Sequence, residues 1–338
     1  MRRLSGRRVE PTHLDRRKKN RSRKLASLLV LGSGGPVPNA DRFGSSHLVR
    51  SGGRNFLFDC GPATTYKLAK FGVSSLDIDH LFVSHHHFDH VADLPAFLLT
   101  RWDHSIGDES RLNIFGPENT STMIDRLVGE EGAFAFDWKA RVDHPLSQRM
   151  HTLRGGDLPR PNPDFEVSDV STGVIIEGDN FRVTSQRVEH VEPQLEANAY
   201  RLDTDEISVV FTGDARPCDH IVDLATGADV LVSMCGNFQS ELLRKGVESG
   251  QIGSLAAAEL AAESDVEQLI AVHMGPDISS AEGRVRALEE MGEIFSGEII
   301  ISDEMTSYDL RRKQSTQSAS PDPSSHRFVV RDRSTSSS

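Results

Sequence analysis

The sequence has few cysteines and no long apolar run. Its 338 residues include three cysteines, an odd number spread widely along the chain. This usage excludes a disulfide-stapled secreted scaffold and favours a reducing compartment, so we expect a cytoplasmic protein. The longest apolar stretch near the start spans residues 25–31, whereas a membrane span needs roughly 20 apolar residues. We therefore expect neither an integral membrane protein nor a membrane partner.

Positive charge is scarce in the middle of the chain and concentrated at its ends. The net charge is −12 overall, yet residues 1–24 carry eleven Lys and Arg residues and residues 311–338 carry six. Residues 25–310 consequently have a net charge of −25, which repels a phosphate backbone. The composition predicts a basic disordered tail over 1–24, a folded domain over 25–312 and a Ser-rich disordered tail over 313–338.

The pattern between the two tails is that of strands alternating with helices. Apolar runs at 25–31, 79–84 and 207–212 predict buried strands, and the patterns at 63–71 and 255–262 predict helices. An α/β layered domain is the simplest interpretation. The Gly- and Pro-rich segment 150–166 is expected to be a long irregular loop that could line a substrate cleft.

A histidine cluster follows the predicted strand 79–84. The run His85-His86-His87-Phe88-Asp89-His90 contains four histidines and one aspartate in six residues. In an extended chain His85 and His87 share a face, because alternate residues point the same way; Asp89 and His90 then turn toward the opposite side. This spacing can serve two neighbouring metal positions with nitrogen and oxygen ligands that suit Zn²⁺.

This His-x-His-x-Asp-His pattern resembles the metallo-β-lactamase superfamily, and later residues match that family's ligands in order. His190 follows the strand 182–189, Asp214 ends another strand and matches the bridging aspartate, and His273 ends the strand 269–272. The runs Gly32-Ser33-Gly34-Gly35-Pro36 and Phe58-Asp59-Cys60-Gly61 narrow the resemblance to the ribonuclease Z-like branch. The resemblance covers about residues 25–310 and implies a four-layer αββα sandwich.

The resemblance also implies a dinuclear metal centre. Three histidines would hold one ion: His85, His87 and His190. The other ion would be held by Asp89, His90 and His273, and Asp214 would bridge the two. Two Zn²⁺ per chain are expected, with Mn²⁺ or Fe²⁺ as alternatives. A metal-bridged hydroxide would attack the ester, with Asp89 and Asp214 as the catalytic residues.

Some assignments stay open at this point. Asp59 either orients a ligand histidine or only closes a turn at the end of a strand. His144 or His151 could replace His190 as the third ligand of the first ion, although the place of His190 at a strand end favours it. The remaining lone histidines, His80 among them, are expected to be surface or turn residues.

Three features separate the chain from ribonuclease Z itself. That enzyme has an exosite arm between its third histidine and its bridging aspartate, whereas His190 and Asp214 are only 24 residues apart here. Ser233-Met234-Cys235 stands where the family usually has His-Glu, and Gln251-Ile252-Gly253 stands where it has a catalytic His-Ser/Thr. A glutamine can donate a hydrogen bond to a leaving oxygen but cannot protonate it.

We therefore expect a dinuclear metal-dependent hydrolase that acts on a small or medium ester, with a phosphodiester as the first choice. A tRNA 3′-processing endonuclease is the alternative, with tRNA disfavoured as a partner because the middle of the chain is acidic. A non-catalytic metal-binding scaffold is a second alternative. We also expect a homodimer, because dimers are common in the family that this chain resembles.

Overall fold

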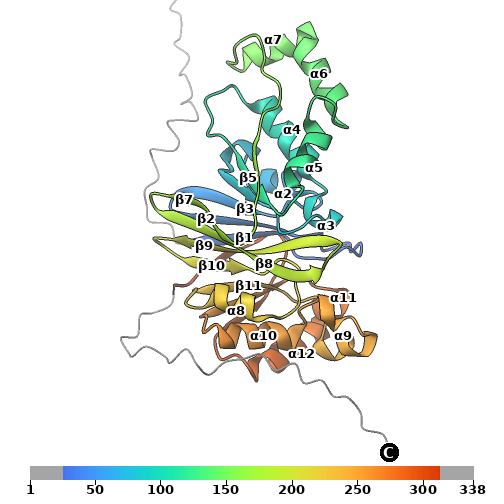
Figure 1. The fold of residues 1–338 in the computed structure, drawn as a ribbon, viewed down its shortest axis with the longest axis vertical. Helices are drawn as coiled ribbons and strands as arrows, with labels where there is room; N and C mark the ends of the chain where they lie inside the picture. The colour runs from blue at the N-terminus through green and yellow to red at the C-terminus, as the bar shows by residue number, and fades with distance from the viewer. Residues whose placement is uncertain (1–25, 313–338) are drawn as a thin grey trace, which may run out of the picture.

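Two face-to-face sheets and two outer layers of helices make up the computed structural model, which describes residues 26–312 (Figure 1). Each sheet has seven strands. The predicted four-layer αββα sandwich is therefore confirmed. Both predicted tails, 1–24 and 313–338, lie outside the described residues. Within 26–312, no helix is both long enough and apolar enough to span a membrane.

The first sheet joins the N-terminal strands to the last strand of the chain. Its order is β14-β1-β2-β3-β4-β5-β6. These strands are β1 (Ser27–Gly32), β2 (Ser46–Ser51), β3 (Arg54–Phe58), β4 (His80–Phe82), β5 (Asn113–Gly116), β6 (Glu166–Asp169) and β14 (Thr306–Asp309). Strands β3 to β6 pair in parallel, so their carboxyl ends meet at one edge of the sheet.

The second sheet holds the C-terminal half of the chain. Its order is β13-β12-β11-β10-β9-β8-β7. These strands are β7 (Gly173–Gly178), β8 (Phe181–Val191), β9 (Leu195–Thr204), β10 (Ser208–Phe211), β11 (Val230–Met234), β12 (Gln268–Val272) and β13 (Glu298–Ile301). Strands β10 to β13 are parallel, and β10 to β12 are nearly all buried, which explains why these three form continuous apolar runs in the sequence rather than alternating ones.

The helices follow the two halves of the chain. Those of the first half are α2 (Thr64–Lys70), α3 (Phe88–Val91), α4 (Leu94–His104), α5 (Thr120–Val128), α6 (Ala135–Asp143) and α7 (Pro145–Leu153). Those of the second half are α8 (Asp219–Ala225), α9 (Gln239–Lys245), α10 (Ser254–Glu263), α11 (Pro276–Ser279) and α12 (Ala281–Gly292). One apolar cluster joins α2, α4 and α5 to the first sheet, and another joins α8, α10 and α12 to the second.

Aromatic side chains fill the space between the sheets. The ring of Phe58 on β3 stacks on that of Phe211 on β10, with centroids 3.9 Å apart, and on that of Phe82, 5.0 Å away. Tyr200 on β9 donates a hydrogen bond of 2.7 Å from its hydroxyl to the carbonyl of Val83. The two sheets are thus joined by packing and by a polar contact just before the histidine cluster begins.

Expectations about two single segments need correction. Residues 154–165 form the expected irregular loop, but the start of 150–166 belongs to α7, and the loop packs on α4, where the indole of Trp102 donates to the carbonyl of Pro161 at 2.9 Å. This segment therefore covers α4 instead of lining the pocket described below. His80 is not a surface residue but is 5% exposed, with its ring 5.6 Å from that of Phe56. Tertiary packing, which local composition does not reveal, decides both cases.

Candidate metal centre

All seven predicted ligands lie at one edge of the sandwich, where parallel strands of both sheets end. His85 and His87 follow β4, and Asp89 and His90 lie in α3. The other three lie on the second sheet: His190 near the end of β8, Asp214 after β10 and His273 after β12. Carboxyl ends of strands are the usual place for sites in α/β sheets, because the loops that follow them converge there.

The local backbone explains how one short run serves two positions. His87 is extended (φ −62°, ψ 143°) and caps α3, which begins at the next residue. Its extended conformation keeps it on the same side as His85, while Asp89 and His90 in the helical turn point elsewhere. Gly213, with φ +58°, precedes Asp214, and a Cβ there would lie 2.9 Å from that of Ser84. Glycine therefore lets Asp214 approach the histidine run.

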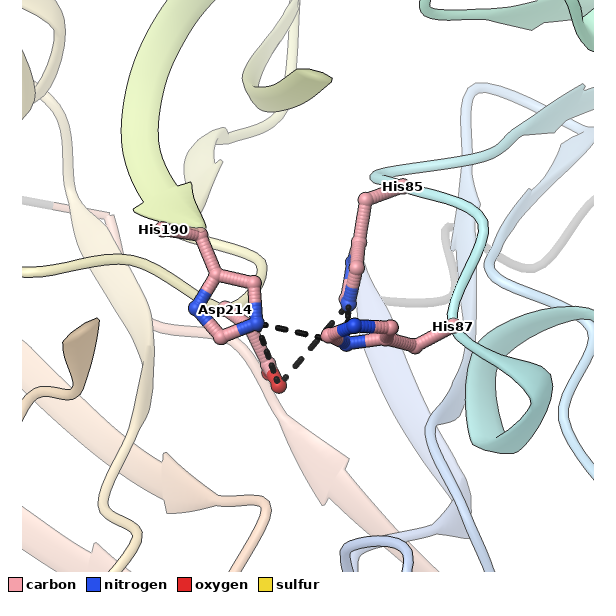
Figure 2. A group of neighbouring side chains, drawn as sticks. All are labelled: His85, His87, His190 and Asp214. Carbon is pink, nitrogen blue, oxygen red and sulfur yellow. Dashed lines mark hydrogen bonds and ion pairs between the residues drawn. The ribbon is translucent and has the colours of Figure 1, made fainter. Parts of the chain in front are cut away.

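The first group consists of three histidines and one aspartate whose side chains point toward a common centre (Figure 2). Nδ1 of His87 lies 3.0 Å from Nε2 of His85 and 3.3 Å from Nε2 of His190. Oδ2 of Asp214 lies 3.9 Å from Nε2 of His85 and 4.0 Å from Nε2 of His190. Four potential ligand atoms thus converge from three separate segments.

The second group lies beside the first and shares Asp214 with it. Asp89 Oδ2 is 3.2 Å from Nε2 of His273 and 3.6 Å from Nε2 of His90. Asp214 reaches the same histidines, with Oδ2 at 3.1 Å from His273 Nε2 and Oδ1 at 3.4 Å from His90 Nε2. One carboxylate therefore contacts both groups, as a bridging ligand must.

The donor atoms fit metal ions in number, type and spacing. Ligands about 2.0–2.1 Å from a tetrahedral ion lie about 3.3 Å from one another, close to the nitrogen separations in the first group. Nε2 of His90 and Oδ1 of Asp214 are buried and have no hydrogen-bond partner. Buried polar atoms without partners are costly, and a cation between them would remove that cost.

Charges within the centre shift the pKa values of its members. Burial alone would lower the pKa of His90, but the carboxylates of Asp214 and Asp59 outweigh it and raise this pKa well above the ordinary value. Burial would likewise raise the pKa of Asp214, yet His273 and His90 hold it well below its usual range. Protons and cations therefore compete for the same nitrogen atoms, and metal binding must release protons.

Neighbouring groups hold the ring nitrogens that face away from the centre. Asp59 Oδ2 accepts from Nδ1 of His90 at 2.7 Å, while Asp59 Oδ1 accepts from the backbone N–H of Ser84, also at 2.7 Å. Nδ1 of His190 donates to the carbonyl of Gly250 at 2.8 Å. The bond to His90 supports the interpretation in which Asp59 orients a histidine of the centre. These bonds fix which nitrogen of each ring is free to bind.

A pocket opens above the two groups. It has a volume of about 530 Å³, and its lining includes His87, His190, Asp214 and His273. Gln251 also lines it, whereas Ser233 is fully buried in β11 and donates to the carbonyl of Met234. Of the residues that depart from the ribonuclease Z pattern, Met234 and Gln251 line the space where a substrate would bind, whereas Ser233 does not.

His86, His144 and His151 belong to neither ligand group. His144 caps α7, and His151 lies within the same helix and is 4% exposed, so neither joins His87. His86, between two ligand candidates, has its Nε2 2.8 Å from Thr120 Oγ1. The supporting carbonyl of Gly250 was not predicted, because a backbone atom 60 residues from its partner leaves no pattern in a sequence.

Comparisons with known proteins agree with this geometry. A family model described as the metallo-beta-lactamase superfamily matches residues 39–273. A ribonuclease Z from Mycobacterium sp. (strain KMS) is 35% identical over 208 residues, which are 62% of this chain and 68% of that protein. The metallo-beta-lactamase fold protein YhfI from Bacillus subtilis has a TM-score of 0.62 at 22% identity, covering 84% of this chain and 99% of YhfI. The short form of human tRNase Z has a TM-score of 0.60 at 18% identity, covering 85% of this chain and 100% of that one.

Proposed function

This chain belongs to the metallo-β-lactamase superfamily, in its ribonuclease Z-like branch, and we propose that it hydrolyses a phosphodiester at a centre of two divalent ions. The observation that carries the proposal is the position of Asp214, which contacts both ligand groups at the floor of an open pocket. Ions bound there would supply a nucleophile at neutral pH and neutralise charge on the attacked ester.

We propose zinc as the metal and Asp89 with Asp214 as the acidic residues nearest the reaction. The donor set contains histidine nitrogens and carboxylate oxygens, a combination common at catalytic Zn²⁺. Mn²⁺ or Fe²⁺ could bind to the same atoms. Residues around the centre orient the proposed ligands: Asp59 fixes the ring of His90, and the Gly250 carbonyl fixes the ring of His190. The amide of Gln251 can donate a hydrogen bond to an oxygen of the substrate.

A tRNA 3′-processing endonuclease is the second candidate, and the name ribonuclease Z carried by the curated relatives favours it. Two observations weigh against it. Between His190 and Asp214 the described chain forms only the rest of β8, β9, β10 and short connections, which leaves no room for an inserted arm. The net charge of −25 over 25–310 also repels RNA. A small or medium phosphodiester therefore remains our first choice.

Turnover of bis(p-nitrophenyl) phosphate by the zinc-loaded full chain tests the proposal. We expect hydrolysis that falls more than about a hundredfold in His87→Ala, because losing a ligand costs at least as much as losing a group that supports one. The matched control is His104→Ala, an exposed histidine on α4 that should keep the wild-type rate. Cleavage of a precursor tRNA without turnover of any small diester would favour the second candidate. Bound zinc with no turnover of either would favour a scaffold.

Compartment and oligomeric state are further proposals. Cys60, Cys218 and Cys235 are all free thiols, which supports the expected reducing cytoplasm. We keep the homodimer as a proposal that sedimentation velocity of the full chain would test, with a single species of one-chain mass as the contradicting result.

A further inference from the structure

One wall of the pocket is the connection between β1 and β2, which we call the pocket loop (Ser33–Phe43). Residues Gly34 to Asn39 of this loop line the pocket together with the metal-binding side chains. At Gly35 a Cβ would lie 2.9 Å from Cε1 of His273, so the loop backbone touches a ligand ring. The pocket loop therefore lies directly beside the centre, although it supplies none of the seven candidate ligands.

A single distant carboxylate fastens both ends of the pocket loop. Oε1 of Glu304, in the turn between β13 and β14, accepts from the backbone N–H of Ser33 at 3.0 Å and from that of Phe43 at 2.5 Å. The ends also bond to each other, from the N–H of Gly34 to the carbonyl of Phe43 at 2.7 Å. The base of the loop is thus closed, while Val37 near its tip is 68% exposed.

Lys67 completes this anchor from α2. Its Nζ donates to Oε2 of Glu304 and to the carbonyl of Leu31, both at 2.5 Å, and lies 4.1 Å from the centre of the Phe43 ring. The two side chains are 6% and 7% exposed. A buried ion pair gains little net stability over apolar packing. Its directional bonds, however, hold the loop ends in one place.

The part of the loop that faces the pocket is apolar. Pro36, Val37 and Pro38 lie on one side, and Met274 and Pro276 also line the cavity. Prolines restrict the backbone and have no N–H to donate, so this wall can offer contact area but few hydrogen bonds. A hydrocarbon or aromatic group of a substrate is the chemistry that such a wall accepts.

We propose that Glu304 and Lys67 are positioning residues: they hold the pocket loop as an apolar wall on which the organic group of the substrate packs beside the metal centre. The inference rests on the proposed function, since it assigns the substrate an aromatic or heterocyclic group next to the reacting phosphate. Neither residue touches the substrate. Both act through the loop, and neither is needed to bind metal.

Two phosphonates test this assignment without requiring turnover. Phenylphosphonate and methylphosphonate carry the same anionic head for the metal centre and differ only in the organic group. The zinc-loaded wild-type chain should bind the phenyl compound about tenfold or more tightly than the methyl compound, because an aromatic ring buries more apolar surface than a methyl group does. Calorimetric titration gives both dissociation constants and hence their ratio.

Glu304→Ala removes both bonds to the loop ends. We expect the phenyl preference to fall about tenfold, toward one, with unchanged zinc content and unchanged affinity for methylphosphonate. Backbone amides of residues 33–43 should also exchange faster with deuterium. The matched control is Glu177→Ala, which removes an exposed carboxylate that pairs with Arg182 and should change none of these readouts. A wild-type ratio in Glu304→Ala would overturn the inference.

A second pair of variants covers the case in which Glu304→Ala does not fold. Lys67→Met leaves the Glu304 carboxylate buried without its cation and should lower the phenyl preference. The double variant Lys67→Met/Glu304→Gln removes both charges but keeps an oxygen that can accept from Ser33 and Phe43, so it should restore the preference. An unchanged ratio in Lys67→Met, or no rescue in the double variant, contradicts the inference.

The outcomes separate this inference from the proposed function. Phenyl preference that depends on Glu304, found in a protein that hydrolyses no phosphodiester, would support the wall and defeat the proposed activity. Hydrolysis of a phosphodiester by a wild-type protein that binds both phosphonates equally would support the proposed activity and contradict the apolar wall.

Discussion

At the scale of single residues, the centre depends on groups that fix histidine rings without binding metal. Asp59 is the clearest case, because its carboxylate accepts from both His90 and Ser84 and lies at a φ of +60° at the end of β3. A backbone conformation that side chains rarely adopt is held here by these bonds. The residue therefore has a structural role in the turn and a role toward the centre at the same time.

Asp59→Asn should weaken zinc binding about 10- to 100-fold, because a neutral amide accepts less strongly from Nδ1–H of His90 and leaves Nε2, the nitrogen that faces the centre, less basic. Competition with a chromogenic chelator measures the zinc dissociation constants. Asp108→Asn, on an exposed loop, is the matched control. Equal zinc affinity in both variants would show that the contact is only structural.

The buried His80 predicts a pH effect on stability. Burial lowers the pKa of His80 to about 4 from an ordinary value of 6.5, so the folded state stays neutral while the unfolded state takes up a proton. The free energy of unfolding should therefore fall as the pH drops from about 6.5 to about 4, by at most about 1.4 kcal/mol per pH unit from this group.

His80→Phe removes that group and keeps an aromatic ring beside Phe56. Urea unfolding of both proteins at several pH values should show the variant gaining stability relative to wild type as the pH falls. A constant difference between the two proteins from pH 7 to pH 4 would contradict the pKa assigned to His80.

The sequence predicted which seven side chains come together at the candidate centre, because their signal is local. The spacing in His85–His90 and the strand ends before His190, Asp214 and His273 are visible without a structure. The anchor of the pocket loop cannot be predicted in this way, because Glu304 and Lys67 are 237 residues apart and each resembles an ordinary surface charge in the sequence. Contacts between distant segments depend on how the layers pack, and a single sequence does not carry that information.

At the scale of strands and helices, the edge of the sandwich keeps its shape because the sheets are tied together near the histidine cluster. Tyr200 on β9 donates to the carbonyl of Val83, and the N–H of Asn198 donates to the carbonyl of Ser84 at 2.9 Å. Both acceptors directly precede His85. The second sheet thereby fixes the segment that carries the first two ligands.

Tyr200→Phe should lower the free energy of unfolding by about 1–3 kcal/mol, because the buried carbonyl of Val83 loses its side-chain donor. The ring still fills its place, so zinc content should stay unchanged. Tyr66→Phe, at a site that is 62% exposed, provides the control. Identical urea midpoints for the two variants would show that the bond between the sheets contributes nothing.

The strands were predicted more completely than the helices. Parallel strands such as β12 are buried on both faces and leave plain apolar runs. The helices α6 and α7, which project at the top of Figure 1, were missed. Trp138 of α6 belongs to the same apolar cluster as Trp102 of α4. Helix α6 is therefore held by a contact with a distant segment rather than marked by a strong local pattern in the sequence.

At the scale of the whole molecule, charges of opposite sign are concentrated in different parts of the sequence. The acidic residues of 25–310 repel the phosphates of a nucleic acid, whereas the eleven Lys and Arg residues of 1–24 carry the positive charge that would attract them. The predicted boundary near residue 25 rests on composition, and it remains a prediction because those residues lie outside the described part of the chain.

Deleting residues 1–24 should leave the kcat/KM for bis(p-nitrophenyl) phosphate within about a factor of two, because the seven proposed ligands and the pocket beside them lie within 26–312. The same deletion should weaken any binding of RNA and reduce its dependence on salt. The full chain serves as the reference in both assays. Loss of diester turnover would show that the domain begins earlier than predicted.

The metal content of the untagged full chain, measured by inductively coupled plasma mass spectrometry, tests the central claim most directly. Two adjoining ligand groups with a shared carboxylate predict about two zinc ions per chain, and fewer in Asp214→Ala because the bridge is lost. Iron in both positions would contradict the choice of metal. A protein that was never exposed to chelator and holds no metal would contradict the dinuclear centre itself.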